Sequence, residues 1–165
     1  MALDTSGDKR IGVLFVCLGN ICRSPMAEAV FAHMVSERGL ADKFFIDSVG
    51  TERYHVGDNP DRRTVLACKK HNVKVSHKGQ VLRSEHFLKF DYILCMDRDN
   101  LSEVKHRGPK GKHRAKWELF GSYSPNADDL IVDDPYYGGM DGFETMFDQI
   151  TRCSEGLLER LQAEL

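Results

Sequence analysis

The sequence predicts an α/β fold in which one parallel sheet is covered by helices on both faces. Two observations support this prediction. Short apolar runs typical of strands alternate along the chain with segments of helical periodicity. The first apolar run is almost uninterrupted, as expected for a central parallel strand that is buried on both sides. In such sheets, ligands bind beyond the carboxyl ends of the strands.

The first apolar run covers residues 11–16 and predicts the first strand. Apolar residues at helical spacing then predict a helix over 25–38. Ser24 is a suitable cap for this helix, and Pro25 suits its first position. Gly39 ends the helical pattern. A strand therefore passes through a short loop directly into a helix.

A second strand is predicted over 44–49, closed by Gly50. After a polar loop, Pro60 opens a second helix whose inward residues are expected to be Val65, Leu66 and Cys68. Residues 73–75 are short and extended, and Ser84 begins a brief helix.

The third strand is predicted over 90–96. Asp97 or Asp99 then caps a helix of about two turns. Residues 105–116 are basic and rich in Gly and Pro, which indicates a surface loop. A solvated loop is preferred to a nucleic-acid or membrane patch, because no aromatic residues are interleaved with the charges before Trp117.

The fourth strand is predicted over 115–120, and residues 122–133 are irregular. Asp141 and Glu144 form a capping-box pattern that opens the longest helix. One face of this helix is apolar and consists of Phe143, Met146, Phe147, Ile150, Cys153, Leu157 and Leu161.

Length, composition and charge fit a single globular domain. The chain has 165 residues, of which 41% are hydrophobic and 29% charged. We expect residues 1–10 to be a flexible lead-in and residues 11–165 to form the domain. The net charge of −2 favours neither nucleic acid nor an anionic membrane. No apolar run approaches the roughly 20 residues of a membrane span. The five cysteines lack paired metal-ligand spacing, which favours a reducing, cytoplasmic location.

The loop between the first strand and the first helix carries the chemistry. It contains Cys17 at the predicted strand end and Arg23 at the predicted helix start. Backbone N–H groups and the positive end of the helix dipole make such a loop an anion site of phosphate size. The same field stabilises a thiolate at Cys17, and the planar fork of Arg23 can bind two anion oxygens. This arrangement points to phosphoryl transfer to cysteine.

The string Cys-Leu-Gly-Asn-Ile-Cys-Arg-Ser-Pro over 17–25 resembles the signature loop of the low-molecular-weight protein tyrosine phosphatases. The resemblance extends from residue 11 to about residue 163. It implies a flavodoxin-like fold with four parallel strands, no cofactor and no metal site. It also implies a phosphate-binding loop formed by Leu18, Gly19, Asn20, Ile21 and Cys22, with Cys17 as nucleophile and Arg23 as phosphate ligand.

Phosphoryl transfer to a thiolate also requires an acid that protonates the leaving group. The segment Asp-Asp-Pro-Tyr-Tyr over 133–137 matches the Asp-Pro-Tyr-Tyr motif of the family, in which the aspartate before proline is the general acid. The resemblance therefore assigns this role to Asp134 and not to Asp133. Pro135 stiffens the segment and biases Asp134 toward an extended backbone.

The resemblance implies supporting roles for further residues. Asn20 would organise the loop through a polar network with Ser24 and His77, and a left-handed backbone is acceptable to an asparagine there. Asp97 would orient Arg23, although a role as helix cap explains it equally well. Cys22 would form a reversible disulfide with Cys17 that protects the nucleophile from over-oxidation.

Four residues are expected to face the substrate: Glu52, Tyr54, Tyr136 and Tyr137. Aromatic side chains can wall a pocket for a phenyl ring, and Leu18 can form the opposite wall. Tyr136 and Tyr137 are also candidate phosphorylation sites by resemblance. Apart from His77, the histidines, His55 among them, receive no role. Cys68, Cys95 and Cys153 lie on apolar faces and are expected in the core.

The sequence thus predicts a metal-independent phosphatase for phosphotyrosine proteins and small aryl phosphates, monomeric or weakly self-associating. An arsenate reductase of the same fold is the first alternative. It would pass oxidation through a further cysteine pair, but Cys68 and Cys95 lie far apart on predicted buried elements. A silent phosphotyrosine-binding module is the second, and the presence of Cys17, Arg23 and Asp134 argues against it.

Overall fold

A computed structural model describes residues 10–165. The predicted lead-in over 1–10 lies, apart from its last residue, outside the described residues. Within these residues the sheet has four parallel strands: β2 (Ile11–Cys17), β3 (Phe44–Gly50), β4 (Tyr92–Cys95) and β5 (Lys116–Leu119). Their order across the sheet is β3-β2-β4-β5, so the strand that ends in Cys17 lies in the middle. The prediction of four parallel strands is confirmed.

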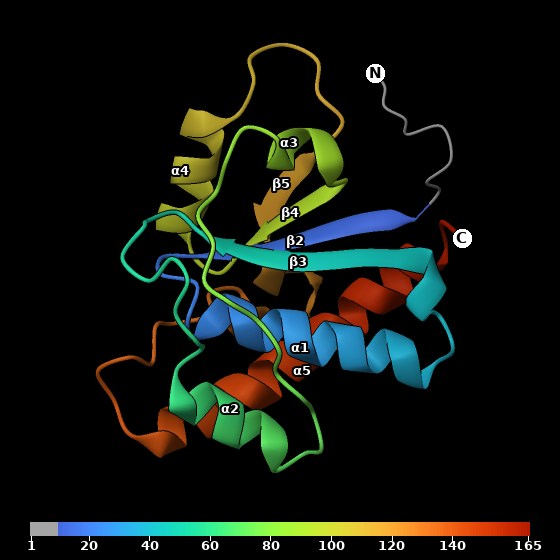
Figure 1. The fold of residues 1–165 in the computed structure, drawn as a ribbon. Coiled ribbons are helices and arrows are strands. Elements are labelled where there is room, and N and C mark those ends of the chain that lie inside the picture. Colours follow the sequence, from blue (N-terminus) through green and yellow to red (C-terminus); the bar gives the residue numbers. More distant parts are fainter. Residues whose placement is uncertain (1–9) are drawn as a thin grey trace.

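Helices cover both faces of this sheet, as predicted (Figure 1). On one face lie α1 (Arg23–Glu37) and α5 (Met140–Gln162), which pack against each other, with α2 (Arg62–Lys69) beside them. On the other face lie α3 (His86–Lys89) and α4 (Arg98–Arg107). Short 3-10 turns occur at η1 (Ala41–Lys43), η2 (Phe120–Tyr123) and η3 (Ala127–Asp129).

The alternation of side chains along β2 divides the core into two halves. Val13 and Phe15 belong to the apolar cluster that faces α1 and α5. Leu14 and Val16 belong to the cluster on the opposite face. All four side chains are fully buried. Burial on both faces is why the sequence of this strand is continuously apolar instead of alternating.

The long final helix matches its predicted apolar face but not its predicted start. All seven predicted inward residues are buried. Gly139 precedes the helix, no side chain caps it, and Asp141 lies inside the first turn. The prediction of Asp141 as cap is therefore wrong. An acidic residue in the first turn still favours the helix through its dipole.

Three other local predictions are also wrong. Ser24 does not cap α1, because it lies inside the first turn and its hydroxyl contacts Cys17. In α2 the cap is Asp61, and the buried face consists of Thr64, Ala67 and Cys68, which leaves Leu66 exposed. The basic segment over 105–116 is only partly a loop, since its first three residues end α4 and its last begins β5.

Within residues 10–165, no helix is long and apolar enough to cross a membrane.

Candidate active site

Cys17 and Arg23 lie at the two ends of one loop, at the carboxyl edge of the sheet. Cys17 is the last residue of β2, and Arg23 is the first of α1. Both are almost fully buried. The loop between them turns through Asn20, whose φ of 60° is left-handed. An asparagine tolerates this conformation better than most residues. The turn brings the N–H group of Asn20 within 3.3 Å of Cys17 Sγ.

A buried polar network holds the loop from behind. Asn20 Nδ2 donates to Ser24 Oγ over 2.7 Å and to Ser48 Oγ over 3.0 Å. Asn20 Oδ1 accepts from His77 Nε2 at 2.6 Å and from the backbone N–H of Gln80 at 2.9 Å. Since Ser24 Oγ accepts from Asn20, its own proton can be donated either to Cys17 Sγ at 2.9 Å or to the carbonyl oxygen of Val49 at 3.4 Å, and the contact with Cys17 is the shorter one. The structure therefore brings Asn20, Ser24 and His77 together as the resemblance implied, and it adds Ser48, which the sequence reasoning missed.

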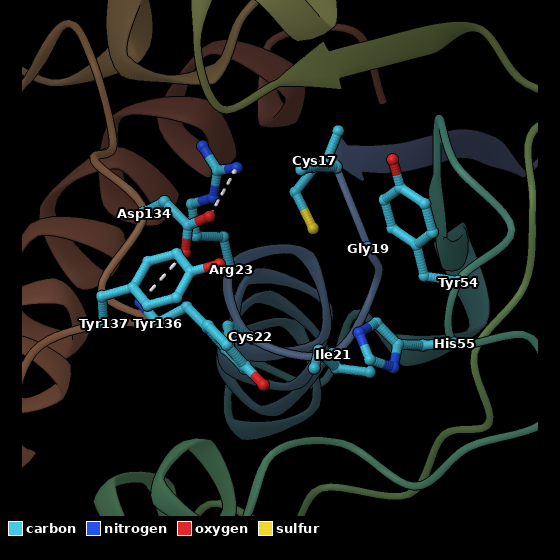
Figure 2. Close-up of a pocket in the computed structure, with 11 residues that line it drawn as sticks. Cys17, Gly19, Ile21, Cys22, Arg23, Tyr54, His55, Asp134, Tyr136 and Tyr137 are labelled. Carbon is cyan, nitrogen blue, oxygen red and sulfur yellow. Dashed lines mark hydrogen bonds and ion pairs between the residues drawn. The ribbon is translucent and has the colours of Figure 1, made fainter.

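Arg23 is held by two carboxylates from distant segments. Its Nη1 atom donates to Asp97 Oδ2 over 2.6 Å and to the carbonyl oxygen of Val132 over 3.2 Å. Its Nη2 atom lies 3.7 Å from Asp134 Oδ2. Burial opposes the charge of the guanidinium, but the nearby Cys17 and the hydrogen bond that Arg23 donates to Asp97 outweigh it, so the pKa of Arg23 is raised. A permanent, oriented cation thus lies beside the cysteine sulfur (Figure 2).

Asp97 makes both of the contacts between which the sequence left the choice open. One carboxylate oxygen binds Arg23, and the other accepts from the backbone N–H of Asn100. In return, the side-chain oxygen Oδ1 of Asn100 accepts a hydrogen bond from the backbone N–H of Asp97. These reciprocal bonds form the capping box of α4. The rigid start of α4 therefore positions the carboxylate that orients Arg23.

Asp134 lies across the cavity from Cys17 (Figure 2). Its Oδ1 atom accepts from the backbone N–H of Tyr136 over 3.0 Å, which turns the carboxylate inward. The side chain remains 42% exposed, so it can exchange protons with solvent. Asp133 is exposed and is not among the residues that line the cavity.

The cavity has a volume of about 260 Å³. Its lining consists of Cys17, Leu18, Gly19, Ile21, Cys22, Arg23, Tyr54, His55, Asp134, Tyr136 and Tyr137. Cys17, Arg23 and the loop between them lie at its base, and mainly apolar and aromatic side chains form its walls (Figure 2). A planar aromatic ring attached to a tetrahedral anion matches this division.

Two rim residues differ from the sequence prediction. Glu52 does not line the cavity, because its carboxylate pairs with Arg107 at 3.4 Å. His55, to which the sequence reasoning gave no role, lines the cavity instead, and its Nδ1 atom lies 3.0 Å from Asp58 Oδ2. The only available signal was its position directly after Tyr54 in the same loop.

All five cysteines are unpaired thiols in this structure. Cys22 is buried at the base of the cavity, and burial, together with the nearby Asp61, raises its pKa. Cys68, Cys95 and Cys153 are fully buried, as predicted, and burial raises the pKa of Cys68 to about 12. Such thiols are poorly suited to passing oxidation onward from Cys17.

Among the residues that the structure describes, one side-chain cluster has the composition of a metal site. Ligand atoms of Glu28, Asp47 and His77 lie within 4.8 Å of one another. These groups already pair with protein atoms. His77 Nδ1 lies 3.0 Å from Glu28 Oε1, which also accepts from Ser48 Oγ, and Gln80 Nε2 donates to Asp47. We therefore assign the cluster to the network that supports Asn20.

Comparison with known proteins agrees with this geometry. The family model for low molecular weight phosphotyrosine protein phosphatase matches residues 12–165. The chain belongs to this family. The Saccharomyces cerevisiae member is 47% identical, and the match covers 92% of this chain and 95% of the yeast protein. The human member is 45% identical over 90% of this chain and 94% of the human protein.

Solved structures of phosphatases share the fold of this family member. A protein tyrosine phosphatase from Entamoeba histolytica, crystallised with Hepes in its active site, superposes with a TM-score of 0.89. It is 36% identical, and the match covers 93% of this chain and 98% of that one. A Drosophila arginine phosphatase gives a TM-score of 0.86 at 39% identity, with coverage of 91% and 97%. The flavodoxin-like prediction is thereby confirmed.

Proposed function

We propose that the chain hydrolyses phosphotyrosine in proteins, and small aryl phosphates, through a cysteinyl-phosphate intermediate. The observation that supports this most directly is the arrangement of Cys17, Arg23 and Asp134 around one cavity with aromatic walls. Cys17 Sγ forms a bond to phosphorus while the bond from phosphorus to the phenolic oxygen breaks. Arg23 and the N–H groups over 18–22 bind the three non-bridging oxygens and stabilise the charge that develops on them.

In the first step Asp134 gives its proton to the departing phenolate, so that phenol leaves neutral. In the second step the ionised Asp134 accepts a proton from water, whose oxygen attacks phosphorus and displaces Cys17 as a thiolate. The hydroxyl of Ser24 lies 2.9 Å from Cys17 Sγ, and its hydrogen bond stabilises that leaving thiolate. The products are inorganic phosphate and the regenerated enzyme.

Aromatic rim residues support an aryl substrate. Tyr54 and Tyr137 are exposed at the mouth, and Tyr136 is partly exposed beside Asp134. Their rings can contact both faces of a phenyl group while the phosphate reaches Arg23. The similarity to an arginine phosphatase makes phosphoarginine the substrate to compare. We expect kcat/KM to be higher for a phosphotyrosine peptide than for a phosphoarginine peptide of the same flanking sequence.

Three further features belong to this proposal. Residues 11–165 act as one catalytic domain in the cytoplasm, as a monomer or weakly associating protein. The thiols of Cys17 and Cys22 lose two electrons and two protons to a peroxide and form a disulfide. Reduction by a cellular dithiol then restores activity.

The test is hydrolysis of p-nitrophenyl phosphate at mildly acidic pH with excess chelator. We expect chelator-resistant turnover that Cys17→Ser abolishes and Asp134→Ala reduces by about 10²-fold or more. The matched controls are Cys22→Ser, which removes the neighbouring loop thiol, and Asp133→Ala, which removes the neighbouring carboxylate. Absence of turnover by the freshly reduced protein would overturn the proposal, and thioredoxin-coupled reduction of arsenate would then support the alternative.

A further inference from the structure

The start of α2 lies between the phosphate-binding loop and the segment that carries Asp134 (Figure 1). On one side it is tied to the loop, because the backbone N–H of Asp61 donates to the carbonyl oxygen of Ile21 over 2.8 Å. Thr64 Oγ1 adds a hydrogen bond of 3.1 Å to the carbonyl oxygen of Cys22. The first turn of α2 is therefore fixed relative to the loop between Cys17 and Arg23.

On its other side, α2 reaches the Asp134 segment through one side chain, Arg63. Its Nη2 atom donates to the carbonyl oxygen of Tyr136 over 2.9 Å, and its Nη1 atom donates to that of Gly138 over 2.8 Å. The guanidinium also stacks over the ring of Phe143 in α5, 4.4 Å from its centroid, and lies 5.6 Å from the ring centroid of Tyr136. One rigid fork thus holds both ends of the turn over 136–138.

Asp61 in turn fixes the direction of that fork. Its Oδ1 atom accepts from Arg63 Nε over 3.0 Å, and its Oδ2 atom accepts from Arg63 Nη2 over 2.9 Å. The hydrogen bond from Arg63 lowers the pKa of Asp61 below its ordinary value of 3.8, although partial burial opposes the shift. Asp61 therefore stays ionised at the mildly acidic pH at which a carboxylic acid donates its proton, and the pair remains intact there.

Tyr136 connects the hydrogen bonds of Arg63 to Asp134. The N–H of Tyr136 donates to Asp134 Oδ1, while its carbonyl oxygen accepts from Arg63. The two peptide units that flank Tyr136 are thus bonded to Arg63 and to Asp134 in series. Asp134 is itself 42% exposed, on an exposed segment, so apart from its 3.7 Å ion pair with Arg23 its direction depends on this support.

We propose that Arg63 is a positioning residue for Asp134, and that it couples the direction of the general acid to the phosphate-binding loop. Arg63 does not line the cavity, and its hydrogen bonds to this segment go to the backbone carbonyl oxygens of Tyr136 and Gly138. The inference rests on the proposed function, because it presumes that Asp134 protonates the leaving group. Lysine would keep the charge but lose the fork, since one ammonium cannot bind two carbonyls and Asp61 in the same geometry.

The experiment compares two substrates that differ in their need for the acid. Phenyl phosphate has a strongly basic leaving group and depends on protonation, whereas p-nitrophenyl phosphate has a weakly basic one. We expect Arg63→Lys to lower kcat/KM by about 10-fold or more for phenyl phosphate and by less than about threefold for p-nitrophenyl phosphate. This ratio reports the first step, whereas kcat also contains the hydrolysis of the cysteinyl phosphate, which is the same for both substrates and also uses Asp134. The inhibition constant for inorganic phosphate should change by less than about twofold, because the phosphate ligands stay in place.

The matched control is Arg62→Lys, which alters the exposed neighbour of Arg63 in the same helix turn and should leave both rates unchanged. Thermal unfolding of each variant establishes that the fold is retained. A double-mutant cycle gives the second readout. If Arg63 acts through Asp134, adding Arg63→Lys to Asp134→Ala should cost less than about twofold further.

The outcomes separate the inference from the function on which it rests. Equal losses for the two substrates, or a full additional loss in the Asp134→Ala background, would refute the role of Arg63 while leaving the phosphatase mechanism intact. If Asp134→Ala alone left turnover of phenyl phosphate unchanged, the assignment of the acid itself would be wrong, and with it the proposal for Arg63.

Discussion

The left-handed Asn20 offers a quantitative test of how the loop between Cys17 and Arg23 is held. Its side chain makes four buried or partly buried hydrogen bonds, to Ser24, Ser48, His77 and Gln80. Each is worth about 1 kcal/mol net, but solvent entering the site can replace some of them, so we take about 3 kcal/mol for the set. An alanine at a φ of 60° adds about 1 kcal/mol of backbone strain, which a glycine avoids.

Two substitutions separate these terms. Asn20→Gly should lower the free energy of unfolding by about 3 kcal/mol and Asn20→Ala by about 4 kcal/mol. Both should lower kcat by an order of magnitude or more, because Ser24 loses the partner that directs its hydroxyl to Cys17. The assays are urea unfolding at constant m-value and turnover of p-nitrophenyl phosphate, each on freshly reduced protein.

Three outcomes for the Asn20 variants would contradict these roles. Losses below about 1 kcal/mol in both variants would mean that the network contributes no net stability. Equal losses in the two variants would mean that the left-handed backbone at this position costs an alanine nothing. Full activity in either variant would show that the direction of the Ser24 hydroxyl does not depend on Asn20.

Three further substitutions test other parts of the structure. Asp97→Asn keeps an oxygen to cap α4 but removes the negative charge beside the buried Arg23. The free energy of unfolding should therefore fall by about 2 kcal/mol, and kcat/KM should fall as well. An unchanged urea midpoint would contradict this prediction. Gly50→Ala would place a Cβ atom 2.7 Å from the carbonyl oxygen of Leu18, in the loop that begins at Cys17. We expect lower affinity for inorganic phosphate, measured by calorimetric titration, and a loss of about 1–3 kcal/mol in unfolding free energy, measured by urea unfolding. The pKa of Asp129 is lowered by its hydrogen bonds with Arg152, so its stabilising effect exists at neutral pH and is lost as pH falls below about 4 through the lowered pKa. Asp129→Asn should therefore cost about 1 kcal/mol at pH 7 and less at pH 3, and a pH-independent difference would argue against this ion pair.

The strands and long helices could be predicted because their signals are local. Burial of β2 on both faces requires an uninterrupted apolar run, and the packing of α5 against α1 requires an apolar stripe. Helix starts were predicted less well. Asp141 and Ser24 are good capping residues, but their chemistry does not specify which turn begins the helix. Contacts with neighbouring groups determine whether such a side chain caps the helix, as where the Ser24 hydroxyl contacts Cys17 instead.

The residues at the rim of the cavity also could not be predicted from local sequence signals. Glu52 and His55 lie in one polar loop, and nothing in their order indicates which faces the cavity. Arg107 at the end of α4 pairs with Glu52, whereas His55 lines the cavity. The choice depends on where a helix from a later part of the chain ends, and this information is absent from the loop itself.

By itself, the sequence determined the element order of an α/β fold and the chemical nature of the loop that begins at Cys17. Both follow from local properties: periodicity, burial and the placement of a thiol and a guanidinium at one strand–helix junction. Only the tertiary structure decided which carboxylates reach Arg23, which side chains form the rim, and that Arg63 bridges to the turn at Tyr136. These pairs join positions more than 70 residues apart, as in Arg23 with Asp97 and Arg63 with Tyr136. The packing of α2, α4 and the final loop around one sheet edge creates such contacts, and no local pattern encodes them.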